Sequence, residues 1–111
     1  MDKEFKELFD KEIEAVKLFL DARKNSDYKN AVGIIIHGPT LQVGDVKATA
    51  KLLDMSDELK YRKADGRYPI EMYFNYNGVE VFSLYDIFEL TEEEFREFKK
   101  TANKEEEEEL L

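Results

Sequence analysis

The chain holds one histidine and no cysteine, which limits the chemistry that its side chains can perform. His37 stands in His37-Gly38-Pro39-Thr40, directly after an apolar run, and an imidazole at a strand end could act as a general base. The Thr40 hydroxyl could hold an anion, because glycine lets a ligand approach the backbone closely. The spacing fits no glycine-rich phosphate loop. We therefore favour a strand-terminating turn and keep a small-ligand site, formed by His37, Gly38, Thr40 and Arg67, as the alternative.

Enzymatic chemistry finds little support in the composition. With a single histidine and no cysteine, the chain lacks the residues for thiolate catalysis and for a Cys/His zinc site. Catalysis would have to use carboxylates, tyrosines or lysines, and no paired arrangement of these is evident. The acids do not follow the spacing of a calcium loop. We predict no catalytic residue, no cofactor site and no metal ligand, and we rank an enzyme last among the function classes.

Aromatic residues are dense in residues 68–88. Tyrosine joins a large apolar surface to a hydrogen-bonding hydroxyl, and it therefore concentrates at protein interfaces. Stacking on nucleic-acid bases is another use of such rings, but it normally needs a basic groove that this segment lacks. Helices that cover both sheet faces would instead place these rings in the core, and that alternative stays open. The residues that we predict to bind a protein partner are Tyr73, Glu80, Phe82, Tyr85, Asp86 and Glu89.

The negative charge of the chain is concentrated in its last third. The formal net charge is −9, and residues 71–111 carry thirteen acids against four bases. Phosphate contacts need clustered lysines and arginines, so this balance argues against direct binding to nucleic acid or to an anionic membrane. It permits a basic protein partner. Lys60-Tyr61-Arg62-Lys63 and Arg67 form a basic cluster that could meet a phosphate or an acidic partner. We favour a solvated edge strand, in which charged residues deter edge-to-edge pairing.

The length and the N-terminal residues predict one domain in the cytoplasm. A chain of 111 residues, 42% of them apolar, can bury a core without disulfides or structural metals. The first residues are charged and lack the apolar run of a signal peptide. No apolar run approaches the roughly 18 residues that a membrane span needs. A reducing compartment agrees with the absence of cysteine.

The first half of the chain predicts a helix, a strand and an ambiguous segment. Apolar residues at three- and four-residue spacing form one stripe over residues 3–23, which is typical of an amphipathic helix. The β-branched run in residues 31–36 predicts a buried strand. In residues 41–54, Asp45 could cap a helix, or a hairpin could turn at Gly44-Asp45. We favour the helix, because this segment holds more helix formers than strand formers.

The second half predicts a hairpin. Asn77-Gly78 lies between two alternating segments, residues 70–76 and 79–84, and this pattern is the strongest short-range indication of a two-residue turn. Such a turn places Phe74 opposite Val81. One face of the hairpin is then apolar and should pack in the core, whereas the other is half apolar and half polar. A short strand over residues 59–63 precedes the hairpin.

Thr91 predicts the start of the last helix. Glu94 follows three residues later and completes a capping box. The run of glutamates at 105–109 is a block of like charges, which is typical of a solvated tail. We therefore predict one domain over residues 1–104 and a disordered acidic tail over residues 105–111.

Together these elements predict an α+β fold with an N-terminal amphipathic helix, a small antiparallel sheet of three or four strands, and a C-terminal helix packed on the sheet. We expect a small, acidic, non-enzymatic protein-binding module that inhibits a basic, nucleic-acid-acting protein. In size, charge and lack of motifs the chain is similar to phage anti-defence and toxin-immunity inhibitors, although no residue pattern carries this likeness. The alternative is a module that binds or sequesters a nucleotide or metabolite near residues 37–40. The oligomeric state stays open, a homodimer included.

Overall fold

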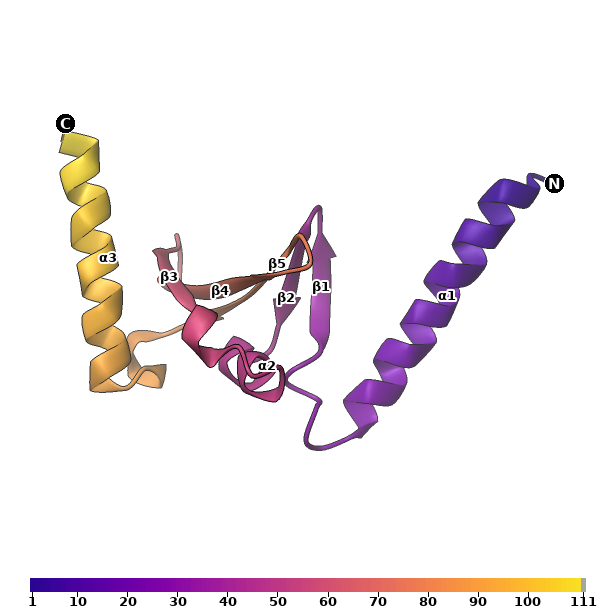
Figure 1. The fold of residues 1–111 in the computed structure, drawn as a ribbon, viewed down its shortest axis with the longest axis horizontal. Helices are drawn as coiled ribbons and strands as arrows, with labels where there is room; N and C mark the ends of the chain where they lie inside the picture. Colours follow the sequence, from indigo (N-terminus) through magenta and orange to yellow (C-terminus); the bar gives the residue numbers. More distant parts are fainter. Residues whose placement is uncertain (111) are drawn as a thin grey trace.

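Over residues 1–110 the chain folds into three α-helices, two short 3₁₀ helices and five strands (Figure 1). In this computed structural model the backbone is described for residues 1–110 and the side chains for residues 1–102. The elements in chain order are α1 (Lys3–Lys24), β1 (Gly33–His37), β2 (Thr40–Val43), α2 (Val46–Leu52), η1 (Ser56–Glu58), β3 (Lys60–Lys63), β4 (Ile70–Tyr76), β5 (Val79–Tyr85), η2 (Ile87–Glu89) and α3 (Glu92–Leu110).

The five strands form one sheet in the order β1-β2-β5-β4-β3. β2 and β5 run parallel, and the other neighbours are antiparallel. The predicted α+β class is confirmed. The sheet is one strand larger than expected and mixed instead of purely antiparallel, because β2 joins it beside β5.

Within residues 41–54 the favoured helix forms, whereas the alternative hairpin with a turn at Gly44-Asp45 does not, because β2 pairs with β1, which precedes it. Gly38 has φ +60°, so the chain can reverse at Gly38-Pro39 and return as β2. The Asp45 side chain then accepts a hydrogen bond from the Lys47 amide and caps α2. The favoured helix is therefore present, and a hairpin strand precedes it.

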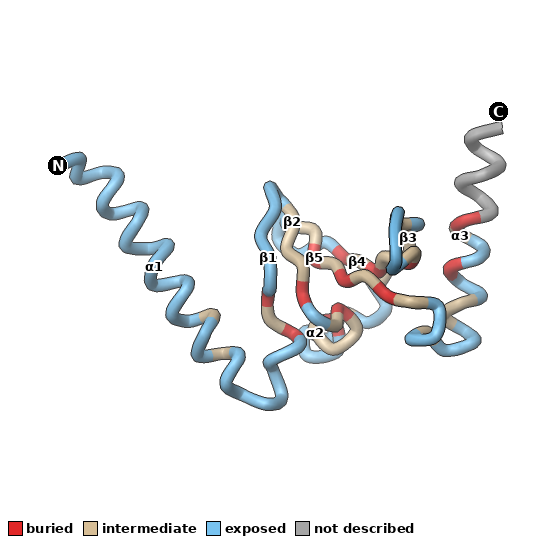
Figure 2. Tube along the Cα trace, turned by 180° about the vertical axis from the view of Figure 1, so that it is seen from behind, coloured by how far each residue is buried: buried red, intermediate tan, exposed pale blue. Residues whose placement is uncertain are grey.

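The β4–β5 hairpin has the predicted register. Asn77 and Gly78 adopt φ values of 50° and 83°, as a two-residue turn requires, and Phe74 pairs with Val81. The apolar face of this hairpin is the centre of the core, in which Ile70, Met72 and Phe74 are buried (Figure 2). The remaining buried members of this cluster are Val43, Val46, Ala50, Val81, Tyr85, Phe98 and Ala102.

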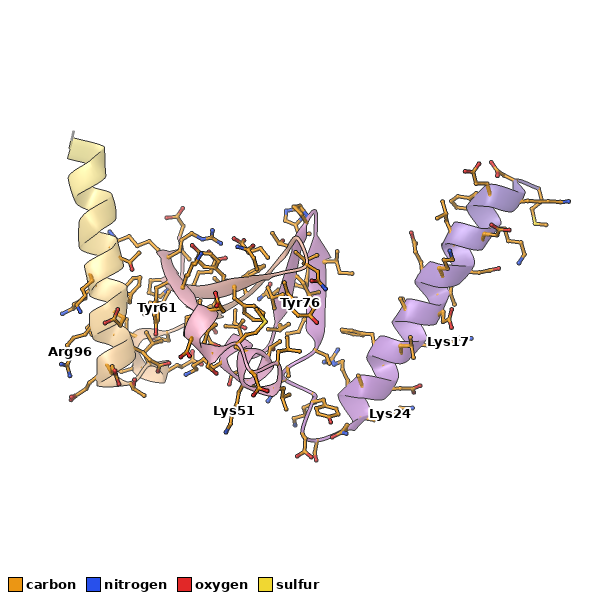
Figure 3. All side chains as sticks on the ribbon, in the orientation of Figure 1. Lys17, Lys24, Lys51, Tyr61, Tyr76 and Arg96 are labelled. Atoms are coloured by element: carbon orange, nitrogen blue, oxygen red, sulfur yellow. The ribbon has the colours of Figure 1, made fainter. Side chains whose placement is uncertain are left out.

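α2 and α3 both pack on this core face of the sheet, as their buried residues Val46, Ala50, Phe98 and Ala102 show. Tyr61 of β3 lies between the sheet and α3 (Figure 3). Burial raises the pKa of its hydroxyl, and the nearby glutamates of the first turns of α3 raise it further.

The start of α3 follows the predicted capping box. The Thr91 hydroxyl accepts from the Glu94 amide at 3.1 Å, and the Glu94 carboxylate accepts from the Thr91 amide at 2.8 Å. The helix continues to Leu110 and so includes the glutamates at 105–109. The predicted disordered tail comprises residues 105–111. The side chains of these residues lie outside the described part of the chain, and so does the backbone of Leu111.

α1 forms over the predicted range, but it does not pack into the core. None of its residues is buried, and in Figures 1 and 2 it stands apart from the sheet on the side of β1. The amphipathic pattern therefore predicts this helix, although its apolar stripe does not pack on the core. The buried residues on the core face of the central strands pack with α2 and α3 instead. Among residues 1–110, no helix combines the length and the hydropathy needed to cross a bilayer.

Candidate functional site

The face of the sheet opposite the core has no buried residue, and we call it the open face. Strand alternation and register place its side chains on one surface. Tyr73 and Phe82 are directly paired at its centre, and Gln42 lies beside Phe82 on the parallel neighbour. The members of the open face are Ile35, His37, Thr40, Gln42, Lys60, Arg62, Glu71, Tyr73, Asn75, Glu80, Phe82 and Leu84.

Arg62 of the edge strand β3 organises this face. Its guanidinium lies 4.1 Å from the centroid of the Tyr73 ring, within the range of a cation–π contact. Its two terminal nitrogens donate to both carboxylate oxygens of Glu80 at 3.1 and 2.9 Å, and its Nε donates to Glu71. Because these partners belong to β4 and β5, one side chain ties three strands together.

The ion-pair network makes the open face nearly neutral. The hydrogen bonds that Arg62 donates to Glu71 and then to Glu80 raise its pKa, so the guanidinium stays charged. Its charge is shared by two half-buried carboxylates. Lys60, which pairs with Tyr73 across β3 and β4, adds a positive charge at the rim. The open face is thus an aromatic surface with balanced charges, and it is not the acidic patch that the composition indicates.

Three of the six predicted partner-binding residues, Tyr73, Glu80 and Phe82, come together on the open face. Tyr85 lies on the opposite face and is only 3% exposed. Its hydroxyl donates to Asp45 at 2.6 Å. Burial and then this carboxylate raise the pKa of Tyr85. The structure therefore places Tyr85 in the core, where it fixes the residue that caps α2.

Asp86 and Glu89 lie beyond the end of β5, in the capping box of η2. The Glu89 carboxylate accepts from the Asp86 amide at 2.9 Å, and the Asp86 carboxylate accepts from the Phe88 amide. These acids serve the local turn and are not part of the open face. Phe88 between them is 88% exposed and has no core contact.

The structure separates the residues of the predicted small-ligand site. His37, Gly38 and Thr40 form the β1–β2 turn, in which the Thr40 hydroxyl donates to the His37 carbonyl at 2.5 Å. Thr40 pairs with Glu80 near one end of β5, whereas Arg67 precedes Ile70, which pairs with Tyr85 at the other end. Five residues of strand separate these ends, which corresponds to about 17 Å. Arg67 instead lies over the ring of Tyr68.

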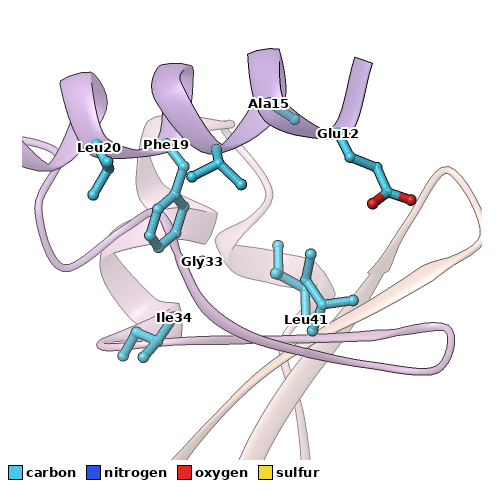
Figure 4. Close-up of a pocket in the computed structure, with 9 residues that line it drawn as sticks. Glu12, Ala15, Phe19, Leu20, Gly33, Ile34 and Leu41 are labelled. Atoms are coloured by element: carbon cyan, nitrogen blue, oxygen red, sulfur yellow. The ribbon is translucent and has the colours of Figure 1, made fainter. Parts of the chain in front are cut away.

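A groove that the sequence did not predict lies between α1 and the β1–β2 hairpin. It has a volume of about 620 Å³. Figure 4 shows side chains of α1 and of the strands pointing toward one another across it. Its lining is apolar apart from Glu12, and it comprises Glu12, Ala15, Val16, Phe19, Leu20, Gly33, Ile34, Ile36 and Leu41.

Among the side chains that the structure describes, no three His, Asp or Glu residues lie together as a metal site would require. The sequence also did not predict that Arg62 organises the open face. This role depends on pairing between β3 and β4, whose partners are separated by a six-residue loop. An Arg-Glu pair across neighbouring strands is a recognisable pattern once the register is known.

No protein-family model matches this chain, and neither a curated protein nor a solved structure matches it.

Proposed function

We propose that this chain is a small, acidic, non-enzymatic protein-binding module of the cytoplasm, and that it binds a basic protein partner and inhibits its action on nucleic acid. The observation that carries the proposal is the open face. Tyr73 and Phe82 are paired there and only partly buried, and the described helices α2 and α3 pack on the other face. Aromatic side chains held on a rigid surface are the usual centre of a protein interface.

The Arg62 network supports this use, because it fixes the ring of Tyr73 before any partner arrives. A surface that is already ordered loses less conformational entropy on binding, and more of its contact energy contributes to affinity. The network also removes the net charge from the centre of the surface. Aromatic anchors with few free charges are typical of the centre of an interface.

The charge distribution favours a basic partner. Residues 71–111 carry thirteen acids against four bases, so long-range attraction would favour the approach of a basic protein. A protein that acts on nucleic acid offers a basic surface of this kind. An acidic module seated on that surface competes with the phosphate backbone, and this is the inhibitory mechanism that we propose.

The proposed nucleotide or metabolite site receives less support. Its four residues divide between the two ends of the sheet, and the Thr40 hydroxyl is engaged by the backbone of its own turn. An enzymatic role lacks a paired acid and base on the open face, where both carboxylates are bound to Arg62. We therefore give protein binding precedence.

The test is capture of partners on immobilised full-length protein at low and high salt, with wild type and the Tyr73→Ala and Phe82→Ala variants. We expect basic nucleic-acid-binding proteins to be captured at low salt and lost at high salt. Both variants should weaken capture about tenfold or more, because each removes a central aromatic anchor. The captured protein should then lose nucleic-acid binding when this chain is added.

Tyr68→Ala is the matched control, because Tyr68 is an exposed tyrosine in the loop before β4 and outside the open face. Circular dichroism and thermal unfolding of each variant establish that the fold is intact. Equal capture by wild type and by both open-face variants would refute the open face as the interface. Capture of acidic or neutral proteins alone would refute the basic partner.

A further inference from the structure

α1 presents a long apolar stripe that nothing in the described chain covers. Phe5 is 62% exposed, and the other large side chains of the stripe are also exposed, except Phe19, which is partly buried. An isolated helix of this length is only marginally stable in water, and helices in proteins gain most of their stability by packing an apolar face. The stripe consists of Phe5, Leu8, Phe9, Ile13, Val16, Phe19 and Leu20.

The two halves of the stripe have different surroundings. The C-terminal half, from Val16 to Leu20, forms one wall of the groove against β1. On the opposite wall, Ile36 of β1 is 80% exposed. The N-terminal half, with Phe5 and Phe9 stacked at 5.7 Å, extends beyond the groove and away from the sheet (Figure 1). One half of the helix is therefore a wall of an apolar groove, and the other half is a protruding apolar ridge.

The charges of α1 favour another copy of the same helix. The chain as a whole has a net charge of −9, yet residues 3–24 carry six acids and six bases. Residues 3–13 have a net charge of −1 and residues 14–24 of +1. Two antiparallel copies thus place each acidic half beside a basic half, and the helix dipoles also favour this orientation. The acidic C-terminal third offers no such surface, since two copies would repel each other there.

We propose that the chain forms a homodimer in which the two α1 helices pack antiparallel around a two-fold axis near Ile13, each inserting its N-terminal ridge into the partner's groove. The same ridge and groove then contact each other twice, as a two-fold interface requires. The interface joins the apolar stripe of α1 to the groove wall that Ile34 and Ile36 of β1 form. The dimer leaves the open face accessible, so it is independent of the proposed function.

The first test is the concentration dependence of mass for the full chain, by light scattering and sedimentation velocity. We expect a monomer–dimer equilibrium in wild type, with the dissociation constant raised about tenfold or more by Phe9→Ala. Leu18→Ala is the matched control, because Leu18 is 64% exposed on the same helix but lies outside the stripe. It should leave the dissociation constant unchanged. α1 has no buried residue, so neither change disturbs the core.

A second test determines the orientation of the helices by disulfide cross-linking. The chain has no native cysteine, so each disulfide can form only at an introduced position. Ile13→Cys, near the axis, should form a disulfide with its own copy under oxidation. Phe5→Cys should not, because the two copies of position 5 lie about 22 Å apart along antiparallel helices. A mixture of Phe5→Cys and Leu20→Cys should cross-link.

Glu12 distinguishes a second copy from other occupants of the groove. In the proposed dimer the two Glu12 carboxylates lie near the axis and repel each other, so Glu12→Gln should tighten the dimer. A cationic segment of a different protein would instead lose affinity, and a small apolar ligand would leave the chain monomeric. A monomer up to about 100 µM, self-linking of Phe5→Cys, or equal effects of Phe9→Ala and Leu18→Ala would each overturn the proposal.

Discussion

The guanidinium of Arg62 lies 4.1 Å from the centre of the Tyr73 ring while it donates to both carboxylate oxygens of Glu80. Arg62 belongs to β3, the edge strand of the sheet, and its partners belong to the next two strands. An edge strand of four residues has few ladder hydrogen bonds of its own, so this side chain contributes to holding it in place. The aromatic centre of the open face therefore depends on a residue at its edge.

Arg62→Ala should lower the free energy of unfolding by about 1–3 kcal/mol, because it leaves two half-buried carboxylates without their cation. Arg62→Lys keeps the charge but cannot bind both oxygens of Glu80, and an intermediate loss is expected. Urea unfolding measures the loss in free energy of unfolding for both variants. Arg67→Ala is the control, since Arg67 contacts only the exposed ring of Tyr68, and its effect should stay within about 0.5 kcal/mol. Equal effects at the two arginines would contradict the role of the network.

Tyr85→Phe should lower stability at neutral pH by about 1 kcal/mol, because Asp45 loses the hydroxyl that donates to it. Folding raises the pKa of Tyr85 above its unfolded value near 10. Above that pH the unfolded chain releases the proton while the folded chain keeps it, so wild-type stability declines as pH rises. Tyr85→Phe lacks this pH-dependent contribution. The difference in free energy of unfolding between wild type and the variant, measured in urea, should therefore shrink between about pH 8 and pH 11. A difference that is constant over this range would refute the assignment.

The parts of the fold that local chemistry determines were predictable. Asn77-Gly78 sets the register of β4 and β5, and the pairing of Phe74 with Val81 follows directly. Thr91 and Glu94 mark the start of α3 for the same local reason. The strand β2 was missed as a separate element, because its four residues adjoin a run of helix formers and its partner β5 is distant in sequence.

The candidate site was predicted only in part, because most of it depends on long-range packing. The alternation of the hairpin places Tyr73, Glu80 and Phe82 on one face. It also indicates that Tyr85 belongs to the other face, but only the structure shows its bond to Asp45. An apolar stripe on a helix predicts burial without saying against which surface, and α1 illustrates that limit.

Thr91→Ala should destabilise the protein by about 1 kcal/mol, because the Glu94 amide loses the hydroxyl that caps it. Thermal and urea unfolding followed by circular dichroism would report the loss. Thr101→Ala, on the same helix, is the control, since that hydroxyl donates only to the Glu97 carbonyl of its own helix. Its effect should stay within about 0.5 kcal/mol. A larger effect at Thr101 than at Thr91 would show that the cap does not limit the stability of α3.

Ser83→Ala should be the most damaging of these changes. Ser83 is 1% exposed, and its hydroxyl donates to the Val43 carbonyl at 2.6 Å and accepts from the Val46 amide at 2.8 Å. It therefore joins β5 to the end of β2 and to the first turn of α2. Alanine fills nearly the same volume but leaves two buried backbone groups unsatisfied, so the loss should reach at least about 2 kcal/mol in urea unfolding. Ser56→Ala, at an exposed position in η1, serves as the reference and should be nearly neutral. A loss at Ser83 no larger than at Ser56 would mean that water reaches these groups, and that the junction between β2 and α2 is open to solvent.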